Sequence, residues 1–326
     1  MLRPLLIPLT YFYLQTWLGI SQAERQEELS MMKDAFDDQY IGCAEEMNRT
    51  ARAQIDLEMS PFSPLWENAR KKWNSVKITI SPPPPPDFED EYGIAIVAYT
   101  DHRPYNGKTF PTIFNDAVNG TERSQTASMA NFQFRAFHYY LTRALQLLRG
   151  KCDETNKMEL YRGTNYMYDG SGEIRFGRFA SSSTKKEKAE EFGRTTVFTI
   201  RTCFGVKIQA MSYNPDQEEV LIPVHEIFKV TKKQGNNIIL HSTNQACSYF
   251  NCGEYWAEHE KYLWGAICCG EFENPTSGRA DERDADLGTC PQGWGRQAAM
   301  TLAAREGLGW GGWTLGLKCS LRKEGA

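Results

Sequence analysis

The chain lacks any marked excess of charge of one sign. Its 326 residues include 37 Lys and Arg against 41 Asp and Glu, so it has no broad basic character of the kind that nucleic-acid or polybasic membrane binding requires. Its five histidines show no helical His-x-x-x-His spacing, and the four cysteines beyond residue 254 show no metal-ligand spacing. We therefore expect neither nucleic acid nor a metal among its ligands.

Long apolar runs are also scarce. The run at residues 5–20 follows a short basic start, and the small residues Ser21 and Ala23 suit cleavage by signal peptidase. An N-terminal membrane anchor is the weaker alternative, because Pro8 and Gln15 interrupt the run. We interpret residues 1–23 as a signal peptide.

No later segment is apolar for long enough to cross a bilayer, and residues 318–326 are not the hydrophobic tail of a lipid-anchor signal. Nine cysteines suit an oxidising compartment. Asn48 and Asn119 begin glycosylation sequons. The sequence predicts a protein that is secreted or held at the extracellular surface, with membrane attachment only if another C-terminus supplies an anchor.

Apolar spacing and turn residues predict an α+β domain over residues 24–253. Helices are expected at 43–75, 110–118, 129–149 and 184–192, and an exposed loop at the proline run 82–86. Strands are expected at 94–100 (buried on both faces), 159–162, 174–183, 196–202, 206–212, 218–222, 227–230 and 238–241. Residues 254–326 show no sustained period, and we expect an irregular, poorly ordered tail.

Three polar motifs interrupt the predicted strands. They are Arg162-Gly163, the serine run that begins at Ser181, and the run of Gln217, Glu218 and Glu219. A buried strand does not normally carry such groups unless a polar ligand satisfies them. Each motif alone has a plainer interpretation: a structural ion pair, a serine-rich edge strand or a solvated carboxylate.

Together the motifs suit an anionic dinucleotide with a reactive sugar. The guanidinium of Arg162 presents a planar fork of donors for a phosphate, and Gly163 allows close backbone approach. The Glu219 carboxylate would stabilise positive charge that develops on a ribose. No histidine is placed as a base, so a serine nucleophile is not expected.

In this order and company the motifs resemble the Arg–Ser–Glu signature of the vertebrate ecto-ADP-ribosyltransferases, over about residues 37–252. The resemblance implies the ADP-ribosyltransferase fold, with N-terminal helices packed on two short, mostly antiparallel sheets and an NAD cleft between them. It makes residues 24–253 a catalytic domain. That domain would transfer ADP-ribose from NAD, with NADP as a further candidate, to arginine residues of extracellular or surface proteins and release nicotinamide.

The resemblance also implies residue roles. Arg162, Ser181 and Glu219 would be catalytic, with Glu219 bonding the ribose 2′-hydroxyl and Ser181 bracing both. Dinucleotide contacts would come from Tyr99, Arg162, Gly163, Arg178, Phe192 and Ser212, with Phe192 against nicotinamide. Disulfides would join Cys43 to Cys252 and Cys152 to Cys203.

One departure from the family concerns the acceptor. Arginine-modifying members carry Glu-x-Glu, whereas Gln217 holds the first of these positions here. Glutamine can accept a hydrogen bond from a guanidinium but cannot neutralise its charge. Glu218 would point to the opposite face of a strand, unless residues 214–218 form a turn. An NAD glycohydrolase with weak transfer, and a catalytically idle recognition protein, therefore stay open as alternatives.

Overall fold

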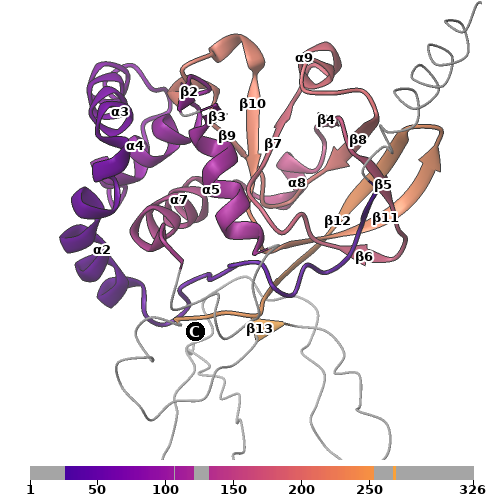
Figure 1. The fold of residues 1–326 in the computed structure, drawn as a ribbon, viewed down its shortest axis with the longest axis horizontal. Helices are drawn as coiled ribbons and strands as arrows, with labels where there is room; N and C mark the ends of the chain where they lie inside the picture. Colours follow the sequence, from indigo (N-terminus) through magenta and orange to yellow (C-terminus); the bar gives the residue numbers. More distant parts are fainter. Residues whose placement is uncertain (1–25, 106, 121–131, 253–266, 269–326) are drawn as a thin grey trace, which may run out of the picture.

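The computed structural model describes residues 26–105, 107–120, 132–252 and 267–268. Most of the helices precede the strands in the chain, and Figure 1 shows them grouped on one side of the sheet. The predicted signal peptide lies outside the described residues, as does nearly all of the predicted tail. Within the described part of the chain, no helix is long and apolar enough to span a bilayer.

The helical region predicted over residues 43–75 is present as two helices, α2 (Ala44–Glu58) and α3 (Ser63–Val76). The 3-10 turn η1 (Ser60–Phe62) joins them. Prolines begin both η1 and α3, which explains the break, because proline is accepted in the first turn of a helix but not in its interior. The core-facing residues of α3 include the predicted Trp66, Ala69 and Trp73.

Helix α4 (Asp90–Tyr99) covers most of the segment predicted as a buried strand at 94–100, so that prediction is wrong. Its apolar residues are buried on every side and show no helical period, and a short apolar run does not distinguish a buried strand from a buried helix. The helix packs closely on α3, since a Cβ on Gly93 would lie 2.4 Å from the Trp73 indole. Asp90 and Glu91 lie in the first turn, and acidic residues at this position indicate the start of a helix.

Helix α7 (Arg135–Leu148) begins later than the start at residue 129 that the sequence predicts. The carboxylate of Glu58, at the end of α2, accepts the N–H groups of Ala136 and Phe137 at 2.9 and 2.8 Å. A side chain distant in sequence therefore caps this helix. Residues 129–131 lie outside the described part of the chain.

Two of the shorter helices follow the predictions with small changes in length, and a third was not predicted. Helix α5 (Phe110–Asn119) agrees with the prediction over 110–118. Helix α9 (Lys186–Glu190) is shorter than the predicted 184–192, and α8 (Cys152–Thr155) was not predicted.

The main sheet brings the three polar motifs onto neighbouring strands. Its spatial order is β6 (Glu173–Ile174), β11 (Glu226–Gln234), β12 (Asn237–Ser248), β8 (Thr196–Arg201), β4 (Leu160–Thr164), β7 (Ala180–Ser183), β10 (Glu219–Ile222) and β9 (Val206–Lys207). All neighbours in this order are antiparallel except β12 and β8. One residue pair, Tyr161 with Ser183, joins β4 to β7. The sheet thus consists of two short halves with a narrow junction.

Smaller elements flank this sheet. Strand β9 covers only the start of the predicted strand 206–212, and the 3-10 turn η2 (Gln209–Met211) follows it. The remaining strands are β1 (Gln26–Glu28) parallel to β5 (Met167–Asp169), β2 (Pro104–Tyr105) antiparallel to β3 (Lys108–Thr109), and β13 (Ile267–Cys268), which pairs with β12.

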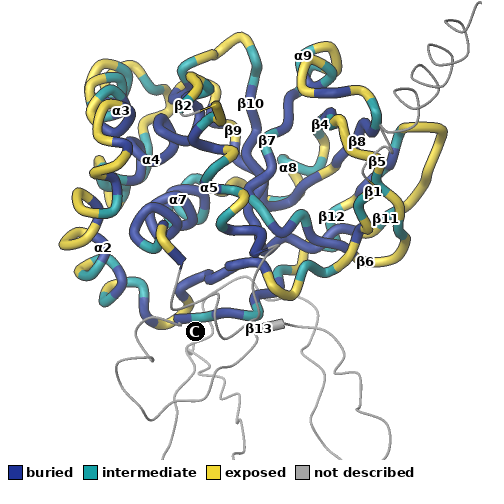
Figure 2. The backbone as a smooth tube through the Cα atoms, in the orientation of Figure 1, coloured by how far each residue is buried: buried dark blue, intermediate teal, exposed yellow. Residues whose placement is uncertain are grey.

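Burial is concentrated where the helices meet the sheet, as the dark blue segments of Figure 2 show. The larger apolar cluster fills this layer and contains stacked and edge-on aromatic rings, among them Phe110, Phe114, Phe137 and Phe179. A second cluster lies among the strands. Aromatic burial of this kind dominates the stability of a core.

Disulfides tie the domain together at two places. Cys43 is bonded to Cys252, 209 residues away, and Cys152 is bonded to Cys203. These are the two pairings that the resemblance implies. Closing the longer loop stabilises the fold by about 5 kcal/mol in the chain-entropy model.

A buried ion pair joins three segments that are distant in the chain. Arg175, just after β6, and Asp37, near the N-terminus, have side chains that are 0 % exposed, and the guanidinium donates to the carboxylate. Arg175 also donates to the carbonyl oxygens of Met31, Met32 and Cys247. Asp37 accepts the N–H groups of residues 249 and 250. Burial raises the pKa of Asp37, and Arg175 opposes that shift.

We expect Arg175→Met to lower the free energy of unfolding by about 3–5 kcal/mol, because it leaves a buried carboxylate without its cation. Urea unfolding with the disulfides intact measures this change. The control is Lys233→Met, which breaks the exposed ion pair of Lys233 with Asp169 and should cost about 1 kcal/mol or less. Equal effects of the two substitutions would contradict this assignment.

Candidate active site

The three predicted catalytic residues lie on three adjacent strands, β4, β7 and β10. Arg162, in β4, is half-buried, and its Nη1 donates to the carbonyl oxygen of Ser181 in β7 at 2.7 Å. Burial lowers the pKa of Arg162, and the nearby Glu219 opposes that shift. The strand order therefore brings together residues that are far apart in the sequence.

Glu219, the first residue of β10, carries the most unusual side chain of the group. It is 3 % exposed, and neither carboxylate oxygen accepts a hydrogen bond from the residues that the structure describes. Burial raises its pKa to about 7, while the Ser181 hydroxyl and Arg162 act in the opposite direction. A buried carboxylate without hydrogen bonds is costly and is typical of a functional site.

Tyr99, predicted as a dinucleotide contact, lies deep in the helical layer. Its hydroxyl donates to the carbonyl oxygen of Phe179 at 3.0 Å and accepts from Asn115 Nδ2 at 2.9 Å. Asn115 also accepts the N–H of Phe179 through its Oδ1 at 3.1 Å. Tyr99 and Asn115 together fix the start of β7, the strand that carries Ser181.

Gly163 allows a close approach, although its neighbour is protein backbone. A Cβ at this position would lie 2.3 Å from the carbonyl oxygens of both Ala189 and Gly193. Ala189 lies in α9 and Gly193 follows it, so the segment of residues 186–193, here called the α9 turn, sits directly on β4. The glycine fixes the position of the segment that carries Phe192.

Phe192 is 49 % exposed, and its ring lies 5.8 Å from that of His102, centroid to centroid. Burial lowers the pKa of His102, with Asp101 acting against it, so this imidazole is neutral near pH 7. His102 follows α4, on the helical side, whereas Phe192 follows α9. No sequence pattern pointed to His102.

Arg178 and Ser212 occupy different surroundings. Arg178 is half-buried and lines a cavity that Arg162 and Asn119 also line. Ser212 is buried, and its hydroxyl accepts the N–H of Asn214 at 3.0 Å, so it stabilises the turn before Gln217.

Gln217 and Glu218 lie in a turn, as the alternative interpretation of residues 214–218 required. The 3-10 turn η3 (Pro215–Gln217) is followed by Glu218 at φ 45°, in the left-handed region. The Glu218 carboxylate binds Lys185 Nζ at 2.8 Å and accepts the Thr184 hydroxyl. Both interactions lower the pKa of Glu218. The turn therefore holds this carboxylate against the segment that begins α9.

The predicted glycosylation sites are not freely projecting side chains. Asn48 lies in α2 and its Nδ2 donates to Glu89 Oε1 at 2.9 Å. Asn119 is 6 % exposed at the end of α5, and its Oδ1 has no hydrogen-bond partner among the described residues.

Within the described ranges, no three His, Cys, Asp or Glu side chains gather in a group that could hold a metal ion.

A family model for NAD:arginine ADP-ribosyltransferase matches residues 29–248. The chain belongs to this family. It is 40% identical over 248 residues to ecto-ADP-ribosyltransferase 5 of Rattus norvegicus, covering 72% of this chain and 78% of the relative. It is 39% identical over 254 residues to the rat T-cell ecto-ADP-ribosyltransferase 2, covering 74% and 86%.

Solved structures agree with this assignment. A mutant of the mono-ADP-ribosyltransferase ART2.2 in complex with NADH matches with a TM-score of 0.59 and 38% identity, covering 69% of this chain and 98% of that one. Another ART2.2 mutant, in complex with NAD, matches equally well. The chain is an NAD-dependent ADP-ribosyltransferase with the fold that the resemblance implied.

We expect Gly163→Ala to lower the free energy of unfolding of the enzyme by about 1–3 kcal/mol, because the new methyl group overlaps two carbonyl oxygens. It should also weaken NAD binding, since the α9 turn must move away from β4. Thermal unfolding and the KM for NAD measure the two effects. Gly150→Ala is the control, because its Cβ would make only ordinary contact, 3.4 Å from Thr155. A change of similar size in both variants would contradict the close packing.

We expect Glu219→Gln to stabilise the enzyme at pH 8 by about 2–3 kcal/mol and to have little effect at pH 4.5. The carboxyl has an ordinary pKa of 4.5 and a folded pKa of about 7, so the folded state binds the proton more tightly. Its contribution is complete below pH 4.5 and is lost as the pH rises through 7. Urea unfolding at the two pH values measures it.

The adjacent substitution Glu218→Gln is the matched control for this test. The pKa of Glu218 is lowered by Lys185 and Thr184, so losing its charge should not stabilise the protein at pH 8. If Glu218→Gln stabilises the protein at pH 8, or if Glu219→Gln does not, the burial of Glu219 does not lower the stability of the folded state as proposed.

Proposed function

We propose that this enzyme transfers ADP-ribose from NAD to arginine side chains of extracellular or cell-surface proteins and releases nicotinamide. The observation that carries the proposal is the buried Glu219 carboxylate, unpartnered among the described residues and close enough to Arg162 and Ser181 for both to shift its pKa. The names of the relatives, which describe ecto-enzymes, support the extracellular location.

Glu219 would act on the sugar. As the bond between nicotinamide and ribose breaks, its electron pair leaves with nicotinamide and positive charge develops on the ribose. An ionised carboxylate held in a dry site stabilises that charge more strongly than water does. A nearby positive charge favours the ionised form of a carboxylate. Binding of the cationic nicotinamide ribosyl group would therefore lower the raised pKa of Glu219.

Arg162 and Arg178 would hold the diphosphate. Both line one cavity. Guanidinium groups suit phosphates because their N–H donors match the spacing of phosphate oxygens. Complexes of the solved relative contain NAD or NADH, which supports NAD as the donor rather than NADP.

Gln217 and Glu218 would determine how an arginine acceptor binds. The main-chain oxygen of Gln217 accepts the Ser183 hydroxyl at 2.6 Å, which fixes the turn beside Glu219. Because Lys185 and Thr184 hold Glu218, an incoming guanidinium would meet an uncharged amide first. This favours NAD glycohydrolysis, with water as the acceptor, as the second candidate function.

We expect Glu219→Gln to reduce nicotinamide release by about 100-fold or more, because the charge that stabilises the sugar cation is gone. Nicotinamide and free ADP-ribose are quantified with purified enzyme, with and without a small guanidino acceptor. Retained release in Glu219→Gln would contradict the proposed chemistry. A folded wild type without any release would point to an idle recognition protein.

In the same assay Gln217→Glu should raise formation of the ADP-ribosyl-guanidine adduct on the order of tenfold or more, since a carboxylate can bind and orient the acceptor. The exposed Gln209→Glu introduces the same charge change in η2 and is the control. An adduct yield that is unchanged in Gln217→Glu would remove Gln217 from the acceptor site. A wild type that releases nicotinamide equally with and without acceptor is the glycohydrolase.

A further inference from the structure

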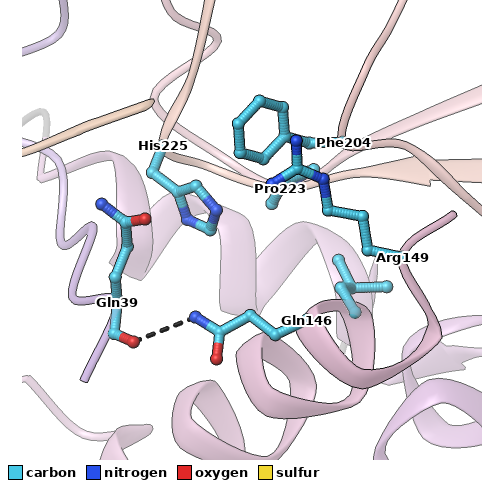
Figure 3. A pocket seen from close by; sticks show the side chains of 7 residues that line it. Gln39, Gln146, Arg149, Phe204, Pro223 and His225 are labelled. Carbon is cyan, nitrogen blue, oxygen red and sulfur yellow. Dashed lines mark hydrogen bonds between the residues drawn. The ribbon is translucent and has the colours of Figure 1, made fainter. Parts of the chain in front are cut away.

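A second cavity, of about 220 Å³, lies at the end of α7 and beyond the end of β10, whereas Glu219 begins that strand. Figure 3 shows the side chains that line it: Gln39, Leu145, Gln146, Arg149, Phe204, Pro223 and His225. They come from the N-terminal segment, from α7, and from the segments after β8 and β10. None of the catalytic or dinucleotide residues lines it, so it is a separate site.

Arg149 supplies the charge of this cavity. Its guanidinium lies over the Phe204 ring, with Cζ 3.4 Å from the ring centroid. Nε donates to the carbonyl oxygen of Cys203 at 3.2 Å, and Nη2 donates to Asn244 Oδ1 at 3.4 Å. A guanidinium has five N–H groups, so donors are left over. Arg149 forms no ion pair with any residue that the structure describes.

Glu226 acts on the Arg149 guanidinium electrostatically but forms no ion pair with it. Glu226 raises the pKa of Arg149, while burial lowers it more strongly. The Glu226 carboxylate is already occupied, since it accepts the Thr202 hydroxyl at 2.5 Å and the N–H groups of Cys203 and Phe204 at 2.7 and 3.2 Å. The cavity thus contains one oriented cation whose charge is not matched by a contacting carboxylate.

His225 adds a second donor. Its ring is 4 % exposed and points into the cavity between Gln39 and Arg149 (Figure 3). Among the described residues its ring nitrogens have no hydrogen-bond partner. Burial, followed by repulsion from Arg175 and Arg149, lowers the pKa of His225 to about 3. The imidazole is therefore neutral near pH 7 and offers one N–H without adding charge.

The two glutamines frame the remaining wall. Gln146 Nε2 donates to the main-chain oxygen of Gln39 at 2.9 Å, and Gln39 Nε2 donates to Ser248 Oγ at 2.7 Å. The Gln146 amide nitrogen carries two hydrogens, so it keeps one for a ligand, whereas the Gln39 amide nitrogen is turned away from His225 (Figure 3). These bonds also hold the amides in place before a ligand arrives.

We propose that this cavity binds a phosphate group, as inorganic phosphate or as a small phosphate monoester. A planar guanidinium stacked on an aromatic ring, a neutral imidazole N–H and the oriented Gln146 amide form a set of donors around one unmatched positive charge. The volume is several times the roughly 30 Å³ of a water molecule. It is below the roughly 300–1,000 Å³ of a typical pocket for drug-sized ligands.

The test is a thermal unfolding series of the wild-type protein in inorganic phosphate and, separately, in ribose 5-phosphate, each against sodium chloride at equal ionic strength. At a phosphate concentration about ten times the dissociation constant we expect Tm to rise by about 2–4 °C. A larger rise with ribose 5-phosphate would identify the monoester as the ligand, and equal rises would identify the phosphate group alone. No rise above the chloride control with either would overturn the proposal.

Two variants separate this cavity from the dinucleotide site. Arg149→Gln should lose the phosphate-dependent rise, measured against its own Tm in chloride, whereas Arg178→Gln should keep it. Arg149→Lys retains the charge without the planar fork and should keep only part of the rise. If the rise survives in Arg149→Gln and disappears in Arg178→Gln, the phosphate binds in the dinucleotide cavity and the proposal is wrong.

Discussion

The buried ion pair between Arg175 and Asp37 is the contact on which the arrangement of the domain depends. Through it the N-terminal segment, the start of the strand region and the end of β12 converge on one guanidinium and one carboxylate, each of which also bonds main-chain groups. The disulfide from Cys43 to Cys252 closes the same region. Because Phe179 lies only four residues after Arg175, this anchor, together with Tyr99 and Asn115, sets the entry of β7 and with it the position of Ser181.

The buried carboxylates of the active site and of the Arg175–Asp37 ion pair differ in how their charges are compensated. Asp37 is buried with a cation and several N–H donors, so its charge is compensated. Glu219 is buried with neither a contacting cation nor a hydrogen bond from the described residues. The surrounding strands hold Glu219 in place because Val220, Leu221 and Ile222 are completely buried. A rigid apolar strand thus supports one destabilising polar group at its end.

Much of this site could be predicted from the sequence, because Arg162, Ser181 and Glu219 each stand out against the apolar strands that carry them. Other parts depend on contacts between distant segments, which no local pattern records. Helix α4 was mistaken for a strand because burial on all sides removes the helical period. The binding of Glu218 by Lys185 follows from a turn with a positive φ, and the cavity at Arg149 and His225 is assembled from separate segments.

The unpartnered carboxylate of Glu219 also has an evolutionary meaning. A substitution that removed its charge would need a single nucleotide change and would stabilise the fold at neutral pH, because the cost of burying the carboxylate outweighs the effects of Ser181 and Arg162. Selection for stability alone would therefore have discarded it. A charged group at the end of an otherwise apolar strand is thus a position where function and stability would select for different residues.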